Sequence, residues 1–155
     1  MRVPLLALLI VVSVGGAVSA DENPKEYPVK LTATIGKPDA QGRQVVQALL
    51  TIRKGYRIFA NPVDHEDLQP LMTTMTISGG ESLRPLDITY PKGELVKNEV
   101  VGSYRIYTNS VALKATVSRA EGDREPLTVK VYVLPIDDSG CRFPPRALTV
   151  RVPVN

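Results

Sequence analysis

The clearest structural signal in this chain is the stretch LTVKVYVL, residues 127–134. Every second residue from Leu127 to Val133 is apolar, and the positions between them include Thr128 and Lys130. Alternation with a period of two is typical of a β-strand that buries one face. The stretch therefore predicts a strand, and the rest of the chain can be compared with it.

The same alternation recurs between clusters of turn-forming residues. No segment carries a sustained apolar stripe with the roughly 3.6-residue period of a helix. We count about eight strands with turn signals roughly every 8 to 12 residues, a spacing that favours an all-β sandwich. The other segments with strand character are residues 29–35, 44–53, 71–78, 83–90, 104–107, 111–117 and 147–154, whereas residues 95–101 are ambiguous.

Residues 1–20 have the features of a secretory signal peptide. A single positive charge, Arg2, precedes an apolar core over residues 5–14, and small residues lead up to Ala20. The core is shorter than the roughly 20 residues that span a bilayer; a retained N-terminal anchor is the alternative. We expect cleavage near Ala20, a periplasmic or secreted location, and one β-sandwich domain over residues 21–155.

The charge pattern argues against a nucleic-acid partner. The chain has 19 Lys and Arg residues and 16 Asp and Glu residues, a formal net charge of +3. These charges are interspersed, without a basic block or interleaved aromatic residues. The only histidine, His65, lies in the run DHED at residues 64–67, with no second ligand at a metal-binding spacing. We therefore predict no metal site and no cofactor.

Cys141 is the only cysteine, so the hydrophobic core rather than an internal disulfide must hold the domain together. Gly140 permits unusual backbone angles beside the thiol, and two prolines stiffen the chain after it. Arg142 could stabilise a thiolate, whereas Asp137 and Asp138 would oppose one. From the residues alone we favour a partly buried, inert thiol, because free cysteine is among the most buried residue types.

Several stretches together resemble a known family. They are PIDDSGCRFPP at residues 135–145 with the strands on either side, GYRIF at residues 55–59, and the strand pair at residues 106–117. The chain resembles the N-terminal periplasmic domain of the thiol:disulfide interchange protein DsbD over nearly all of the mature sequence. The resemblance implies an immunoglobulin-like β-sandwich. It also implies electron transfer from a membrane electron-transfer protein to thioredoxin-like periplasmic partners.

The resemblance also assigns roles to individual residues. The family has two active-site cysteines with five residues between them; Cys141 stands at the second position and Pro135 at the first. Cys141 is therefore the candidate thiol, able to form a mixed disulfide but not to resolve it from within. Phe143 and Pro144, which follow it, are candidate partner-contact residues.

A cap loop that shields the thiols in the family corresponds here to residues 97–102. Asn98 and Glu99 stand at its acidic positions, and Val100 and Val101 replace its aromatic residues. The resemblance makes Glu99 the candidate acid near Cys141. The alternative is a solvated loop glutamate.

Three interpretations follow. The first is an exported domain that binds thioredoxin-like redox partners, with mixed-disulfide chemistry at Cys141. The second is a non-redox interaction domain that kept the fold after losing the cysteine pair, and the third is a structural sandwich with a buried cysteine. We favour a DsbD-type partner-binding domain, with single-cysteine chemistry and a Cys141-linked dimer as open options and no enzymatic activity assigned.

Overall fold

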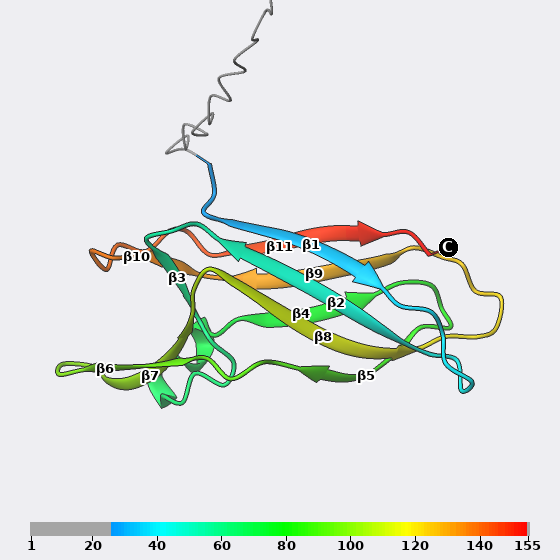
Figure 1. Ribbon diagram of the computed structural model, residues 1–155, viewed down its shortest axis with the longest axis horizontal. Helices are drawn as coiled ribbons and strands as arrows, with labels where there is room; N and C mark the ends of the chain where they lie inside the picture. The colour runs from blue at the N-terminus through cyan, green and yellow to red at the C-terminus, as the bar shows by residue number, and fades with distance from the viewer. Residues whose placement is uncertain (1–25, 155) are drawn as a thin grey trace, which may run out of the picture.

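The computed structural model describes residues 26–154, so the expected signal peptide at residues 1–20 lies outside the described residues. Strands dominate the described part of the chain (Figure 1). The expected all-β, immunoglobulin-like sandwich is confirmed. The strands are β1 (Val29–Ile35), β2 (Arg43–Ile52), β3 (Tyr56–Phe59), β4 (Thr74–Ser78), β5 (Arg84–Thr89), β6 (Glu94–Asn98), β7 (Gly102–Tyr107), β8 (Ser110–Ser118), β9 (Leu127–Val133), β10 (Pro135–Asp137) and β11 (Arg146–Val152), and the 3-10 helix η1 is Glu66–Leu71.

Two antiparallel sheets form the sandwich. One has the strand order β1-β2-β8-β5 and the other has the order β11-β9-β4. The stretch that gave the clearest sequence pattern, β9, is the central strand of the second sheet, where Val131 pairs with both Met75 and Leu148. Its alternate residues are buried because they face the first sheet across the core. No helix in residues 26–154 is long and apolar enough to cross a membrane.

The main core lies between these two sheets and consists of the inward-facing residues of their strands. In β2 the burial alternates residue by residue, so that Val46, Ala48 and Leu50 are fully buried while Val45 and Leu49 face solvent. Leu113 in β8 is also fully buried. The two-residue period seen in the sequence is therefore the period of burial, as expected for a sheet that covers a core with one face.

A third sheet, with the order β10-β3-β7-β6, extends one end of the sandwich. It covers a smaller core of its own together with η1. That core contains Phe59, Val63, Leu68, Tyr104, Ile106, Leu134 and Ile136. Because Leu134 and Ile136 flank the start of β10, this core fixes the strand from which the cysteine loop leaves.

The structure differs from the sequence-based expectations in its short elements. Residues 66–71 form the 3-10 helix η1, although the sequence pattern indicated no helix. The strand expected at residues 71–78 begins only at Thr74, and β5 contains a register shift between Pro85 and Asp87. The ambiguous residues 95–101 contribute to β6 and to the tight turn into β7, with Asn98 opposite Gly102.

Candidate functional site

Cys141 lies on a loop that folds back along β10. We define the cysteine loop as residues 138–145, between β10 and β11. The Asp137 backbone N–H donates to the carbonyl of Cys141 at 3.0 Å, and the Phe143 N–H donates to the carbonyl of Pro135 at 2.8 Å. The first half of the loop is therefore a small hairpin on the outer edge of β10. Gly140 makes its turn with φ +85°, in the left-handed region that favours glycine.

The carboxylate of Asp137 organises this hairpin. Its Oδ1 accepts hydrogen bonds from the Ser139 backbone N–H at 3.0 Å, the Ser139 hydroxyl at 2.7 Å and the Cys141 backbone N–H at 2.8 Å. The bond from the Ser139 side chain, followed by those from backbone N–H groups, lowers the pKa of Asp137 below its usual value. The charged form of Asp137 thus holds the backbone on which the thiol is carried.

The thiol itself is exposed. The partial burial of this cysteine that we favoured from the residues alone is therefore wrong. The reason is local geometry: the residues around Cys141 face solvent on the outer side of β10, where no further strand covers them. A sulfur in this position is accessible to a reagent or to a docking protein.

An aromatic cluster supports the exit of the loop. Phe143 packs edge-on against Tyr27, with ring centroids 6.3 Å apart, and against Tyr56, at 5.4 Å. The Tyr27 hydroxyl donates to the carbonyl of Pro144 at 3.1 Å, and the Arg146 guanidinium lies 4.5 Å from the Tyr27 ring centroid. Burial raises the pKa of Tyr27 to about 12, so this hydroxyl keeps its proton. Edge-to-face rings and a stacked guanidinium both favour a fixed geometry.

The loop is also attached to the turn between β2 and β3. The Asp138 backbone N–H donates to the carbonyl of Gly55 at 3.1 Å. Gly55 has φ +84°, and a Cβ added there would lie 3.6 Å from the Asp138 carboxylate. Residues 55–59, which carry part of the family resemblance, therefore contact the cysteine loop directly. The role of Tyr27 was not expected from the sequence, because residues 21–28 contain no strand pattern.

The expected cap residues lie elsewhere. Asn98, Glu99, Val100 and Val101 are all exposed and form the turn between β6 and β7. In the sheet order β10-β3-β7-β6, two strands separate β6 from β10, and Figure 1 shows the β6–β7 turn and β10 on different edges of the same end. These residues do not shield the thiol in this conformation.

The β6–β7 turn has its own supports instead. The Asn98 side-chain oxygen accepts from the N–H groups of Val100 and Val101 at 2.8 and 2.9 Å. The carbonyl of Val101 lies 2.7 Å from Nε2 of His65. His65, which we considered as a metal ligand, thus fixes a turn, and the described residues contain no group of three or more potential metal ligands.

Position 135, which the sequence resemblance assigns to the family's first cysteine, is part of the core. Pro135 is fully buried and pairs with Ile58 of β3, while its carbonyl accepts the bond from Phe143. The full sequence contains no second thiol. A disulfide formed by Cys141 therefore cannot lie within residues 1–155.

Comparisons with known proteins give one kind of evidence, structural likeness. No protein-family model matches the chain, and no curated protein matches it. The DsbD N-terminal domain of Neisseria meningitidis in the reduced form matches with a TM-score of 0.50 and 16% sequence identity, over 71% of this chain and 77% of that chain.

Two further solved structures match more weakly. The complex between the DsbD and PilB N-terminal domains of Neisseria meningitidis matches with a TM-score of 0.46 and 17% identity, over 77% of this chain and 80% of that one. The N-terminal periplasmic domain of ScsB from Proteus mirabilis matches with a TM-score of 0.49 and 11% identity, over 81% of this chain and 44% of that one. From the first of these likenesses, together with the antiparallel sheets described above, this chain has the immunoglobulin-like fold of a DsbD N-terminal domain.

Proposed function

We propose that this protein is an exported domain that binds thioredoxin-like redox partners at the end of the sandwich that carries Cys141. The observation that carries the proposal is an exposed thiol on a loop held by Asp137 and Phe143. The DsbD-like fold and the resemblance of residues 135–145 to the family's active-site segment support the same function. Export rests on the signal-like residues 1–20, with cleavage near Ala20 and a mature domain at residues 21–155.

The chemistry we propose is thiol–disulfide exchange with one cysteine. The Cys141 thiolate attacks one sulfur of a partner disulfide, so that a new S–S bond forms and the partner's S–S bond breaks. The second partner sulfur leaves as a thiolate, and the number of disulfides is unchanged. Because the chain has no second thiol, that released partner thiolate reverses the step and frees Cys141.

The test is to trap the mixed disulfide. The full chain is incubated with a thioredoxin-like protein whose second active-site cysteine is replaced by serine and whose remaining cysteine carries a small aromatic thiol as a mixed disulfide. Attack by Cys141 on the partner sulfur then releases the aromatic thiolate. We expect a covalent 1:1 adduct that dithiothreitol releases, and none with Cys141→Ser. The matched control Ser139→Ala keeps the thiol and is expected to retain the adduct.

The alternative is a non-redox interaction or structural domain. It is favoured by the absence of a second cysteine and by the burial of Pro135 at the family's first cysteine position. It predicts that Cys141→Ser binds partners as the wild type does. Absence of any adduct under conditions in which Cys141 reacts with a small alkylating reagent would reject the redox proposal and leave this alternative.

A further inference from the structure

A crevice opens at the end of the sandwich opposite to the cysteine loop. It consists of two adjoining cavities of about 470 and 430 Å³, which share Pro38, Gln44 and Val154 in their walls. The walls come from the β1–β2 turn, the β8–β9 turn and the chain after β11, which Figure 1 shows together near the C-terminal end. Each cavity is within the range of about 300–1,000 Å³ that small-molecule sites occupy.

One wall of the larger cavity holds a buried arginine whose hydrogen bonds are incomplete. Only 3% of the Arg119 side chain is exposed. Its Nη2 donates to the carbonyl of Glu125 and lies 3.4 Å from Oδ1 of Asp123. Its Nε and Nη1 are buried without an acceptor among the described residues. A guanidinium is always charged, and buried N–H groups nearly always have partners, so this site lacks an acceptor.

Two of the neighbouring carboxylates, Asp123 and Asp39, do not supply that acceptor, because other donors occupy them. A third, Glu121, also lines the cavity, and no hydrogen bond joins its exposed carboxylate to Arg119. Asp123 accepts from the Ser82 hydroxyl and the Glu125 N–H, and these bonds, led by that from Ser82, lower its pKa. Asp39 accepts from the Gln41 and Arg43 N–H groups and from the Arg43 guanidinium. An acceptor for Nε and Nη1 of Arg119 therefore has to come from a group other than Asp39 and Asp123.

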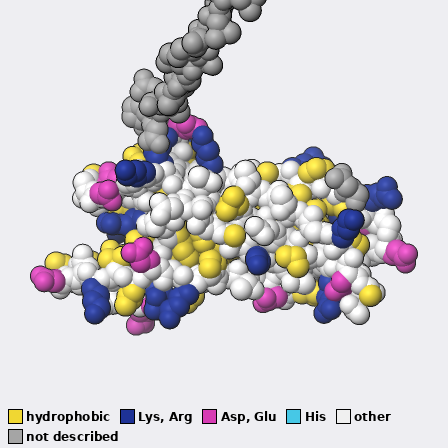
Figure 2. All heavy atoms as spheres, viewed as in Figure 1, with side chains coloured by type: hydrophobic (Ala, Val, Ile, Leu, Met, Phe, Trp, Pro, Cys, Tyr) yellow, Lys and Arg dark blue, Asp and Glu magenta, His cyan; other side chains and the backbone are white. Residues whose placement is uncertain are grey.

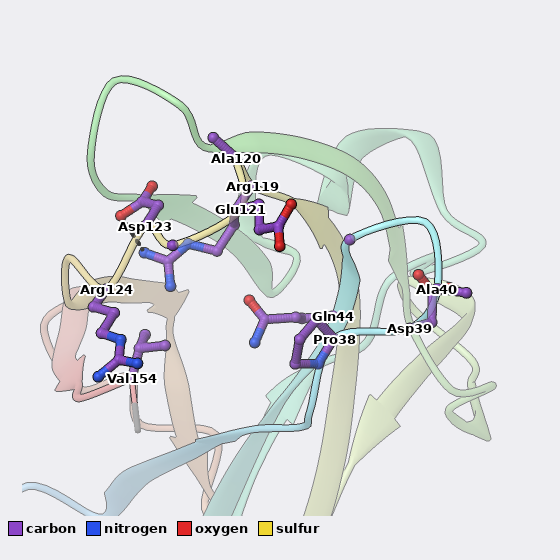
Figure 3. A pocket seen from close by; sticks show the side chains of 12 residues that line it. Pro38, Asp39, Ala40, Gln44, Arg119, Ala120, Glu121, Asp123, Arg124 and Val154 are labelled. Atoms are coloured by element: carbon purple, nitrogen blue, oxygen red, sulfur yellow. Dashed lines mark hydrogen bonds and ion pairs between the residues drawn. The ribbon is translucent and has the colours of Figure 1, made fainter.

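The surroundings indicate what kind of molecule would fit. In Figure 3 the side chains of Arg119, Arg124 and Gln44 border the same hollow, with Arg119 opposite Gln44. The adjoining smaller cavity is lined mainly by small and apolar residues. These are Ala33, Ile35, Pro38, Val152, Pro153 and Val154.

We propose that this crevice binds an amphipathic carboxylate. The carboxylate accepts hydrogen bonds from the unpartnered nitrogens of Arg119, with Arg124 adding positive charge, and a short hydrocarbon chain lies in the adjoining apolar cavity. Hydrogen bonds between a guanidinium and a carboxylate are among the strongest in proteins. Access to both nitrogens requires a shift of the turn at residues 120–124, and its tip, Gly122, has open space around it. This site is separate from the thiol and its function.

The first test uses the wild-type full chain and three probes. Octanoate carries both the charge and the chain, acetate carries only the charge, and 1-octanol carries only the chain. In ¹H–¹⁵N NMR titrations we expect octanoate to shift amides at residues 33–44, 119–125 and 152–154 with saturation. Acetate and octanol should each bind at least about tenfold more weakly, because each lacks one half of the recognition. Equal binding of octanol and octanoate, or saturable shifts elsewhere only, would overturn the proposal.

The second test uses variants. Arg119→Gln removes the charge and is expected to weaken octanoate binding at least about tenfold, as for the loss of hydrogen bonds to a charged group. Arg124→Gln, on the exposed turn, leaves the buried contacts intact and should weaken binding a few-fold. Lys114→Gln, which removes an exposed positive charge on the outer face of β8, is the matched control. If Arg119→Gln folds and binds octanoate as the control does, the proposal is wrong. If Arg119→Gln does not fold, the octanoate affinities of Arg124→Gln and Lys114→Gln are compared instead, and equal affinities would overturn the proposal.

Discussion

At the cysteine end of the sandwich, the carboxylate of Asp137 accepts three hydrogen bonds and the thiol faces solvent. At the crevice end, the guanidinium of Arg119 is buried and two of its nitrogens lack an acceptor among the described residues. The cysteine loop joins β10 of the third sheet to β11, whereas the crevice lies among the β1–β2 turn, the β8–β9 turn and the chain after β11. At one end a hydrogen-bonded loop exposes a thiol, whereas the other end buries a charged group with two nitrogens that lack an acceptor among the described residues.

The difference shows that the exposure of a functional group and the number of its hydrogen bonds together indicate what kind of molecule it can bind. An exposed thiol on a well-bonded loop can meet a macromolecule without rearrangement. A buried, incompletely bonded guanidinium has unused capacity for a small ligand that brings an acceptor with it. Figure 2 shows basic and acidic side chains interspersed over one face of the molecule, so neither function follows from overall charge.

The largest effect on stability is expected from a core substitution that should leave the accessibility of Cys141 unchanged. Leu113→Ala removes a fully buried side chain in the core between the two ends and should lower the free energy of unfolding by about 3 kcal/mol. The rate at which iodoacetamide modifies Cys141 under native conditions should stay unchanged, because the thiol is exposed without unfolding. Denaturant titration and alkylation kinetics measure the two quantities. An alkylation rate that rises with the loss of stability would mean that Cys141 reacts only after opening.

The second prediction compares an arginine from each end. Arg119→Ala removes the donor to the carbonyl of Glu125 and one of the donors to the carboxylate of Asp123, and should cost about 2 kcal/mol of unfolding free energy. Arg146→Ala removes an exposed guanidinium from the ring of Tyr27 and should cost about 0.5 kcal/mol. Urea unfolding of both variants measures the difference. Equal losses of unfolding free energy in the two variants would show that the buried contacts of Arg119 contribute no more to stability than the exposed contact of Arg146.

The third prediction concerns the Tyr27 hydroxyl, which donates to the carbonyl of Pro144 at 3.1 Å and lies 3.4 Å from that of Val133. Tyr27→Phe should lower the free energy of unfolding by about 1 kcal/mol at neutral pH. Burial raises the pKa of Tyr27 to about 12 from 10.0, so the hydroxyl's contribution is complete below pH 10 and falls as the pH rises through 12. Wild type and variant should therefore converge above pH 10. A constant difference up to pH 12 would contradict this assignment.

The smallest effect on global stability is expected at Asp137, whose role is local. Asp137→Ala should speed hydrogen exchange of the Ser139 and Cys141 amides, while Asp138→Ala, whose side chain makes no described hydrogen bond, should not. Hydrogen bonds lower the pKa of Asp137, so its contribution is present above the unfolded pKa of about 4 and is lost as pH falls below it. Amide NMR between pH 7 and 3 measures both. Protection that persists in the Ala variant would assign the loop's order to Phe143 instead.

The long strands could be predicted from the sequence because their signal is local. Residues 127–133 and 111–117 alternate strictly, and both became central strands of the sandwich. The short elements could not be predicted: β10 has three residues, and η1 is a six-residue segment that contains Pro70. Their conformations depend on packing around Phe59, Val63 and Leu68, which are contributed by separate parts of the chain.

The candidate site divides in the same way. The sequence identified Cys141 and the stiff loop around it, because a single cysteine and two adjacent prolines are recognised from residue identity alone. It misjudged the exposure of the thiol, since burial depends on whether another strand covers the edge of β10. It also placed residues 98–101 over the thiol, whereas the strand order puts β3 and β7 between them.

By itself, the sequence determined that this protein is an antiparallel β-sandwich with one thiol, because the alternation of apolar residues and the number of cysteines need no knowledge of neighbours. Only the tertiary structure decided that Cys141 is exposed, that Asp137 bonds the backbone of its loop, and that Arg119 is buried beside a crevice. Those properties arise from contacts between residues far apart in the chain, and a pattern with a period of two carries no information about which turns meet at each end of the sandwich.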